Sequence, residues 1–296
     1  MSAVAAAALR PGLGRATASL LAAVTIWSAT FVVTKEALAG VGPMTLMLLR
    51  FATGAACLAP FARRHGFRLR MSLEPRYVTF GLTGMVLHIG LETTGLLFTS
   101  AATASLIVAA IPAVTAALSV VVLHERPSRV NVAGIALSVA GVVAVTNARV
   151  EDAGRLQGLG NLLVLGGVVA WAAFTMQGKR LSARVPALVT TTAAMGAAVV
   201  ILVPLAGAEL ALGGAPEVGP TTAAAVAYLG VLASAVAYGL WNHALEHVDA
   251  SAAATYVNLV PVLGVAFALL AGEPASASQI AGGAIVGAGV WLSTRR

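Results

Sequence analysis

One pattern occurs twice in the sequence, and this repetition limits the folds open to the chain more than any other feature. Residues 104–145 hold two apolar runs, each approaching the roughly 20 residues that a helix needs to cross a bilayer, with Pro112 inside the first run. Residues 253–290 repeat this arrangement, with Pro261 in the corresponding place. The second run of each copy carries two glycines seven residues apart, which are Gly134 and Gly141, then Gly282 and Gly289. The sequence is therefore an internal duplication built from apolar helices.

The composition places these helices in a membrane. Of the 296 residues, 59% are hydrophobic and 10% are charged, and the mean hydropathy is +0.92. Soluble domains carry about 25% charged residues, so this chain has too little polar surface for water. The net charge of +7 would suggest a nucleic-acid partner in a soluble protein. Here the positive residues fall in short loops between apolar runs, which indicates orientation in a bilayer and no nucleic-acid partner.

We expect an all-α integral membrane protein with ten transmembrane helices. Two five-helix repeats at 17–147 and 157–293 are flanked by a lead at 1–16, a linker at 148–156 and a tail at 294–296. The ten spans are expected at about 17–37, 43–62, 76–98, 101–123, 128–147, 157–179, 185–206, 219–245, 250–271 and 276–293.

Arginine and lysine set the expected orientation. Loops on the side of the N-terminus carry most of them, whereas the opposite side has only Arg149 and Arg155, with Lys35 near that face. Because positive loops stay in the cytoplasm, we expect both termini there and the chain in the inner (plasma) membrane.

The first spans of the two repeats share a second pattern. Trp27 and Lys35 are eight residues apart, as are Trp171 and Lys179. Each repeat holds an odd number of spans, so the repeats should enter the membrane in opposite orientations. Inverted repeats place a substrate site near the midplane, at the interface between the repeats. The pattern alone therefore predicts a transporter.

These same residues resemble a known family. The segment WSATFVVTK at 27–35, the triplet Leu49-Arg50-Phe51 and the two blocks of Pro, Glu, Gly and Gly are similar to the drug/metabolite transporter superfamily, and most to its EamA-type ten-helix members. The resemblance implies a basket of ten helices that exports small metabolites by alternating access. Exporters of amino acids, including aromatic ones, are prominent members. One departure is Arg126, beside Glu125, because Glu273 has no such neighbour.

Charged and titratable residues inside the spans need a reason, because a central arginine or lysine costs about 2.5–3.5 kcal/mol on insertion scales. Arg50 could meet a substrate carboxylate and Glu92 could take a proton. Alternatively, Glu92 pairs with Arg50 or Lys35 and locks three helices together. His88 lies four residues before Glu92, on the same helix face, so the two could relay a proton, since histidine titrates near neutral pH. The alternative is a histidine bound to a neighbouring backbone carbonyl.

Aromatic residues form a stripe in each repeat and predict the lining of a mainly apolar cavity. Trp27 and Phe31 lie one turn apart in the first span, and Trp171 and Thr175 repeat the spacing in the sixth. Packing alone is the alternative. Further expected lining residues are Tyr238, Tyr256 and Asn258. Such a pocket suits a ligand with a hydrophobic side chain, most simply an amino acid.

The prolines, acidic residues and glycines of the duplicated blocks have structural roles in our interpretation. Pro112 and Pro261 should kink the fourth and ninth spans, as hinges or as fixed bends. Glu125 and Glu273 should cap the helices that follow them. The glycines should form helix contacts, either within the fold or in a dimer.

Two other classes of protein compete with a transporter. An intramembrane enzyme acting on lipid-like substrates would need a catalytic motif, but neither His-Glu-x-x-His nor Gly-x-Ser-x-Gly occurs. A channel would need rings of like charge, which the sequence lacks. No phosphate-binding loop occurs either, so we expect no enzyme, no cofactor and no metal, and transport driven by an ion or substrate gradient.

Overall fold

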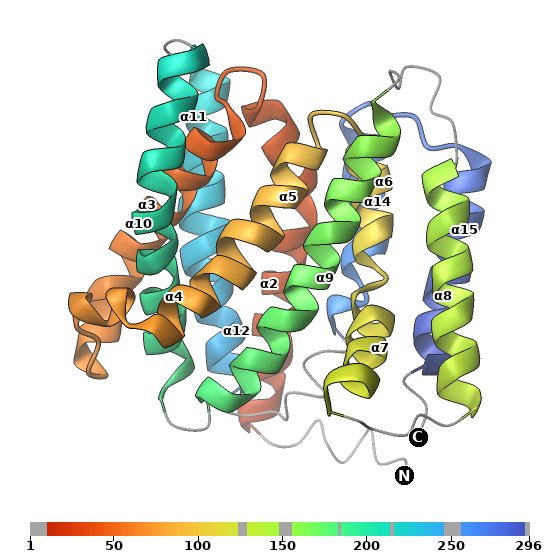
Figure 1. Cartoon of the computed structure of the whole chain (residues 1–296), viewed down its shortest axis with the longest axis horizontal. Helices are drawn as coiled ribbons and strands as arrows, with labels where there is room; N and C mark the ends of the chain where they lie inside the picture. Colours follow the sequence, from red (N-terminus) through yellow and green to blue (C-terminus); the bar gives the residue numbers. More distant parts are fainter. Residues whose placement is uncertain are drawn as a thin grey trace.

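The computed structural model describes residues 11–123, 129–147, 156–182, 185–213, 216–245 and 256–293. Within these ranges the secondary structure is helical and contains no strand (Figure 1). Glu125, the predicted cap of the fifth span, lies outside the described residues. The all-helical class expected from the sequence is confirmed.

The helices follow the order of the expected spans. Before residue 148 they are α2 (Pro11–Ala37), α3 (Pro43–Arg64), η1 (Leu69–Leu73), α4 (Pro75–Gly81), η2 (Leu82–Leu87), α5 (His88–Gly95), α6 (Ala101–Val108), α7 (Ile111–Leu123) and α8 (Arg129–Asn147). After it they are α9 (Gln157–Ser182), α10 (Ala187–Gly213), α11 (Pro220–Ala227), η3 (Tyr228–Val236), α12 (Ala237–Leu245), α14 (Val260–Leu270) and α15 (Ala277–Ser293).

Within the described residues, five continuous helical stretches are long and apolar enough to cross a membrane. They are Gly14–Ala37, Pro43–Arg64, Gln157–Gly178, Ala187–Gly213 and Pro220–Ala244. Shorter apolar helices occupy Ala101–Thr115, Val132–Val145, Val260–Leu270 and Ala277–Leu292. The chain is thus built as a multi-pass membrane protein.

The seventh span ends later than the sequence predicted. We expected it to stop near residue 206, but α10 continues through Pro204 to Gly213. The added turns carry Glu209, whose carboxylate accepts hydrogen bonds from the backbone N–H groups of Met44 (3.0 Å) and Thr45 (2.8 Å). These donors belong to the first turn of α3, which has no partners of its own for them. The extended α10 therefore caps α3.

Each half of the chain contains one helix that changes to π-helical geometry. The continuous helix α4–η2–α5 starts at Pro75 and turns π-helical over η2, and α11–η3–α12 starts at Pro220 and does so over η3. In η3 the Ser234 hydroxyl donates to the carbonyl of Leu229, five residues earlier, at 2.8 Å. π-helical turns occur often at functional sites, and these two mark corresponding helices of the two halves.

The predicted kinks at Pro112 and Pro261 are breaks instead. α6 ends at Val108, and Pro112 is the second residue of α7. Pro261 is likewise the second residue of α14, after a turn at residues 258–259. A proline in the first turn of a helix loses no hydrogen bond, because the N–H at that position has no helical partner. Restarting the helix is therefore cheaper than bending it, and the hinge role stays a prediction.

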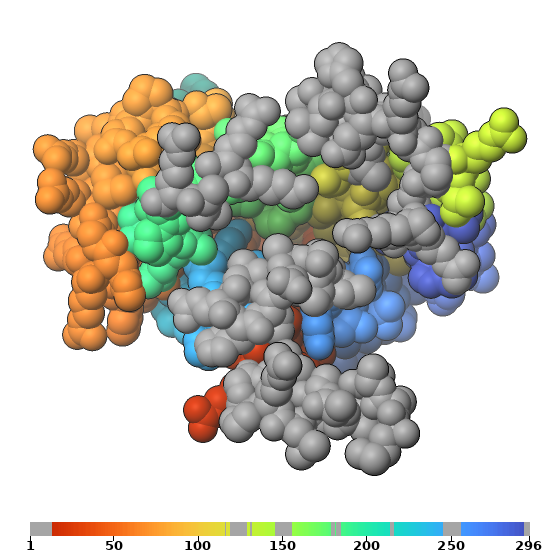
Figure 2. Space-filling model, turned by 90° about the horizontal axis from the view of Figure 1, so that it is seen from below, coloured from red at the N-terminus to blue at the C-terminus, as the bar shows by residue number. Residues whose placement is uncertain are grey.

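Packing interleaves the two halves. α2 packs against α12 and α14 of the second half, and α9 packs against α5, α6 and α7 of the first. The pairs α3·α10 and α8·α15 join equivalent helices of the two halves. In Figure 1, α8 and α15 stand side by side at one edge of the bundle. Seen from below, the segment around residues 60–80 covers the opposite edge (Figure 2).

The glycines of the duplicated blocks form the α8–α15 contact. A Cβ atom on Gly141 would lie 2.6 Å from the amide nitrogen of Val286 and 2.9 Å from the carbonyl oxygen of Gly282, and one on Gly289 would lie 2.7 Å from the carbonyl oxygen of Gly134. Early residues of α8 thus meet late residues of α15, and the reverse, so the helices are antiparallel. Of the two alternatives for these glycines, the contact within the fold is confirmed.

Candidate functional site

Trp27 is held on the inner side of α2 by the second half of the chain. Its indole Nε1–H donates to the carbonyl of Ala233 in η3 at 3.0 Å. The ring meets Tyr238 edge to face, with 5.2 Å between ring centroids, and tilts against Trp241 at 5.3 Å. The polar edge of Trp27 therefore points to protein and not to lipid, as a residue of an interior site must.

Trp171 occupies the corresponding place in the other half. Its ring lies 4.8 Å from the His88 ring and 5.1 Å from the Phe174 ring, measured between centroids. His88 is buried, and its Nδ1 lies 2.9 Å from the carbonyl oxygen of Gly167 on α9. A carbonyl only accepts, so Nδ1 carries the proton and Nε2 is left as an acceptor. The predicted alternative of a histidine bound to a backbone carbonyl is thus correct, and it orients the imidazole beside Trp171.

Arg50 is buried between α3 and η3. Its side chain donates from Nε to the hydroxyl of Ser234 at 3.1 Å, and only 4% of the residue is exposed. Ser234 is itself buried and held by the π-helical turn. The sequence analysis missed Ser234, because a serine in an apolar run gives no signal until its neighbour across the interface is known.

Glu92 does not form the ion pair that the sequence suggested. It is 8% exposed, and the ion pairs among the described residues are Lys35–Glu273 and Arg76–Glu74. Lys35 is drawn away because its Nζ lies 2.8 Å from Glu273 Oε1. The predicted lock of three helices through Glu92 is therefore wrong.

The predicted capping role of Glu273 is also wrong. Its other carboxylate oxygen accepts from the backbone N–H of Ala102, in the first turn of α6, at 3.3 Å. α15 is capped instead by Ser276 and Gln279, whose side chains each accept a hydrogen bond from the backbone N–H of the other. Glu273 thus ties α2 to the start of α6, a role that sequence spacing does not reveal.

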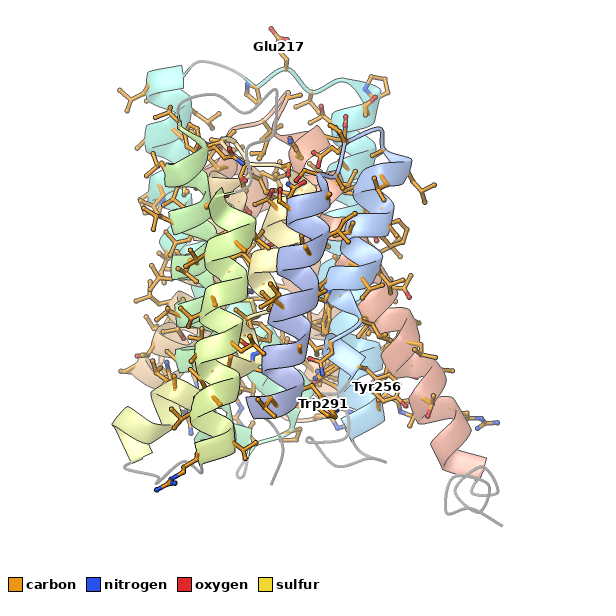
Figure 3. The ribbon with its side chains drawn as sticks, turned by 90° about the vertical axis from the view of Figure 1, so that its right-hand side faces the viewer. Glu217, Tyr256 and Trp291 are labelled. Carbon is orange, nitrogen blue, oxygen red and sulfur yellow. The ribbon has the colours of Figure 1, made fainter. Side chains whose placement is uncertain are left out.

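The lysine–glutamate pair lies at a defined end of the bundle. The end of α2 is adjacent to Glu217, because a Cβ atom on Gly40 would contact the backbone of Glu217. Figure 3 shows Glu217 at one end, and Tyr256 and Trp291 at the other. The Lys35–Glu273 ion pair and Tyr256 therefore lie at opposite ends of the bundle.

The remaining predicted lining residues make contacts of other kinds. Phe31 is buried in an apolar cluster with Val24 and Val260. The Thr175 hydroxyl donates to the carbonyl of Trp171 within its own helix at 2.9 Å. Tyr256 is partly buried against the cluster that also contacts Trp241, and Asn258 is exposed in the turn before α14. The structure thus places Trp27, Tyr238, Arg50, His88, Glu92 and Trp171 on helices through which the two halves pack.

The described residues hold no group of three or more histidine, cysteine, aspartate or glutamate side chains that could bind a metal ion. The candidate site instead combines aromatic residues with a buried arginine and a buried glutamate. Such a site can bind a small molecule with an apolar body and a charged head.

Comparison with known proteins agrees with this description. The EamA-like transporter family matches the chain twice, at residues 15–147 and 158–295. A "probable terminal-alkyne amino-acid exporter" of Streptantibioticus cattleyicolor is 32% identical, over 96% of this chain and 95% of that protein. A "probable amino-acid metabolite efflux pump" of Salmonella typhimurium is 29% identical, over 92% of each chain. An "uncharacterized transporter" of Archaeoglobus fulgidus is 30% identical, over 92% of this chain and 94% of its own.

One solved crystal structure shares the fold. It superposes with a TM-score of 0.64 at 24% sequence identity, covering 94% of this chain and 96% of the other.

Proposed function

Because the chain belongs to the EamA-like transporter family, we propose that it is a secondary transporter that exports amino acids or related small amphipathic metabolites. The observation that carries the proposal is the pairing of Trp27 with Tyr238 and of Trp171 with His88. Each pair joins one half of the chain to the other, and the buried Arg50 and Glu92 lie on α3 and α5, which pack against η3 and α9. Aromatic rings offer contact area to an apolar side chain, while the charges suit a polar head.

The names of the relatives support the substrate class. The proteins of S. cattleyicolor and S. typhimurium that align over nearly the whole chain are named for amino-acid export and amino-acid metabolite efflux. We extend that class to this chain because its site combines apolar and charged groups in the same way that an amino acid does.

The proposed architecture is ten spans in two inverted repeats, at 17–147 and 157–293. The contact of α8 with α15 supports the inversion because these equivalent helices of the two repeats are antiparallel. Gly141 meets Gly282, the equivalent of Gly134, and Gly289, the equivalent of Gly141, meets Gly134. The excess of arginine in the loops on the side of the N-terminus supports cytoplasmic termini and an inner-membrane location.

The proposed mechanism is alternating access around the site at the repeat interface. The short turns at 109–110 and 258–259, before Pro112 and Pro261, interrupt the regular α-helix at points where the fourth and ninth spans could pivot. A proton exchanged for substrate is the driving force we favour, with Glu92 as its carrier beside His88.

The proposal is tested in cells. Cells that express the chain and are loaded with radiolabelled amino acids should lose label faster than vector-only cells, with the largest effect for hydrophobic amino acids. The proposal would be refuted if, for every amino acid, expressing cells with the protein in the membrane lost label at the same rate as vector-only cells.

A further inference from the structure

Arg50 is anchored through its Nε and lies on a face of α3 that packs against two other helices. Met47, one turn earlier on α3, packs near Gly90 of α5, since a Cβ atom on Gly90 would lie 3.2 Å from the Met47 Cε. Gly54, one turn later, packs against Ser234, with 2.7 Å between its added Cβ and the Ser234 Cβ. The face of α3 that carries these residues and Arg50 therefore looks toward both α5 and η3.

The guanidinium uses a small part of its hydrogen-bonding capacity in this place. Nε is engaged by Ser234, which leaves the Nη groups, and an arginine has five N–H donors in all. In the described part of the chain, the Nη groups take part in neither ion pair. A buried arginine without a carboxylate partner is costly in a membrane, so the position calls for an anionic ligand.

Glu92 offers the complementary charge from α5. It is buried on α5, which packs against α3, and it too takes part in neither ion pair of the described residues. An arginine and a glutamate on adjacent helices, with no ion pair between them, can each take one charge of a zwitterion. Tyr238, in edge-to-face contact with Trp27, belongs to the same buried cluster as Met47, which lies one turn from Arg50.

We infer that Arg50 and Glu92 together recognise the zwitterionic head group of the substrate. The Nη groups of Arg50 donate two parallel hydrogen bonds to the carboxylate, and the carboxylate of Glu92 accepts from the ammonium group. Trp27 and Trp171 contact the side chain of the ligand. This inference rests on the proposed function and narrows it to free α-amino acids, excluding amides, esters and amines.

The test compares L-phenylalanine with two analogues that each lack one charge. Phenylalaninamide lacks the carboxylate, and 3-phenylpropionate lacks the ammonium group. Competition of each compound with labelled phenylalanine is measured in proteoliposomes that contain the wild-type chain, Arg50→Gln or Glu92→Gln. Arg76→Gln is the matched arginine control, because Arg76 is exposed and pairs with Glu74. Glu209→Gln is the matched carboxylate control, because Glu209 caps α3.

The wild-type chain should prefer phenylalanine to either analogue by about 10- to 100-fold, the effect of losing charge-assisted hydrogen bonds. Arg50→Gln should abolish the preference over phenylalaninamide and keep the preference over 3-phenylpropionate. Glu92→Gln should do the reverse. Both controls should retain both preferences, even if Glu209→Gln lowers the amount of folded protein.

Two results would overturn the inference without touching the proposed function. One is a wild-type chain that transports phenylalanine yet binds all three compounds equally, a comparison that needs no variant to fold. The other is a pair of folded variants whose preferences match the wild type. If the wild-type chain moves no amino acid at all, the proposed function and this inference both fail.

Discussion

Removing the ion pair between Lys35 and Glu273 should loosen one end of the bundle. The pair joins the end of α2 to the segment before α15, and through Ala102 to the start of α6. The side chains are 39% and 19% exposed, so solvent screens their attraction. Partly exposed pairs contribute about 0.2–1 kcal/mol, which corresponds to about a 1.4- to 5-fold change in the ratio of two conformations. We expect Lys35→Gln to raise the population in which this end of the bundle is open, relative to the closed population, by about 1.4- to 5-fold.

Glu273→Gln separates charge from hydrogen bonding. Glutamine keeps an oxygen that can accept from the Ala102 amide but loses the attraction to Lys35. Its effect should therefore be no larger than that of Lys35→Gln. The exchange of both residues, Lys35→Glu with Glu273→Lys, should restore most of the closed population.

The populations can be measured by the distance between two spin labels in reconstituted protein. The labels are attached at Ala39 and Ala277, which are exposed and lie four residues after Lys35 and Glu273. Cys57→Ser removes the single native cysteine. Glu36→Gln is the control, because Glu36 is the exposed neighbour of Lys35 and lies outside the pair. Distance distributions that are the same in Lys35→Gln, Glu273→Gln and Glu36→Gln would show that the pair does not bias closure.

Three further predictions concern packing, the site and topology. Gly141→Ala should destabilise the protein by about 1–3 kcal/mol through overpacking against α15, which would lower the unfolding temperature in detergent. Gly287→Ala should change that temperature little, because its added Cβ would lie in open space. Equal effects of the two variants would contradict the close contact. Trp27→Ala and Trp171→Ala should reduce phenylalanine transport about tenfold or more while lowering the protein level much less; unchanged transport in both variants would place the pocket elsewhere. Reporter fusions after Arg70, Glu217 and Arg296 should read inside, outside and inside, and an outside reading at Arg70 would overturn the orientation.

The features visible in the sequence are those that repeat or that follow from composition. The duplicated glycines predicted a helix contact, and both Gly141 and Gly289 lie in the contact between α8 and α15. Small residues at helical spacing allow two helices to approach closely wherever they meet. Trp27 and Trp171 were found because the duplication repeats them, and both contact interior groups. Local pattern suffices for such residues.

Features that depend on registration between distant helices were missed. Lys35 could have met Glu92 or Glu273, and only the packing of α2 beside α14 and α6 decides for Glu273. The π-helical turn that brings Ser234 to Arg50 adds a residue to a turn without changing composition. The end of α10 was predicted too early, because the cap that the Glu209 carboxylate provides for α3 depends on the contact between these two distant helices.

The central claim, that this chain moves amino acids across a membrane, is tested most directly by counterflow. Proteoliposomes that contain the purified chain and a high internal concentration of unlabelled L-phenylalanine are diluted into a trace of labelled phenylalanine. Exchange through the protein should concentrate label inside above its external level for a time, and Trp27→Ala with Trp171→Ala should remove this overshoot. Label that only equilibrates, as in protein-free liposomes, for phenylalanine and for every other amino acid tested would contradict the account.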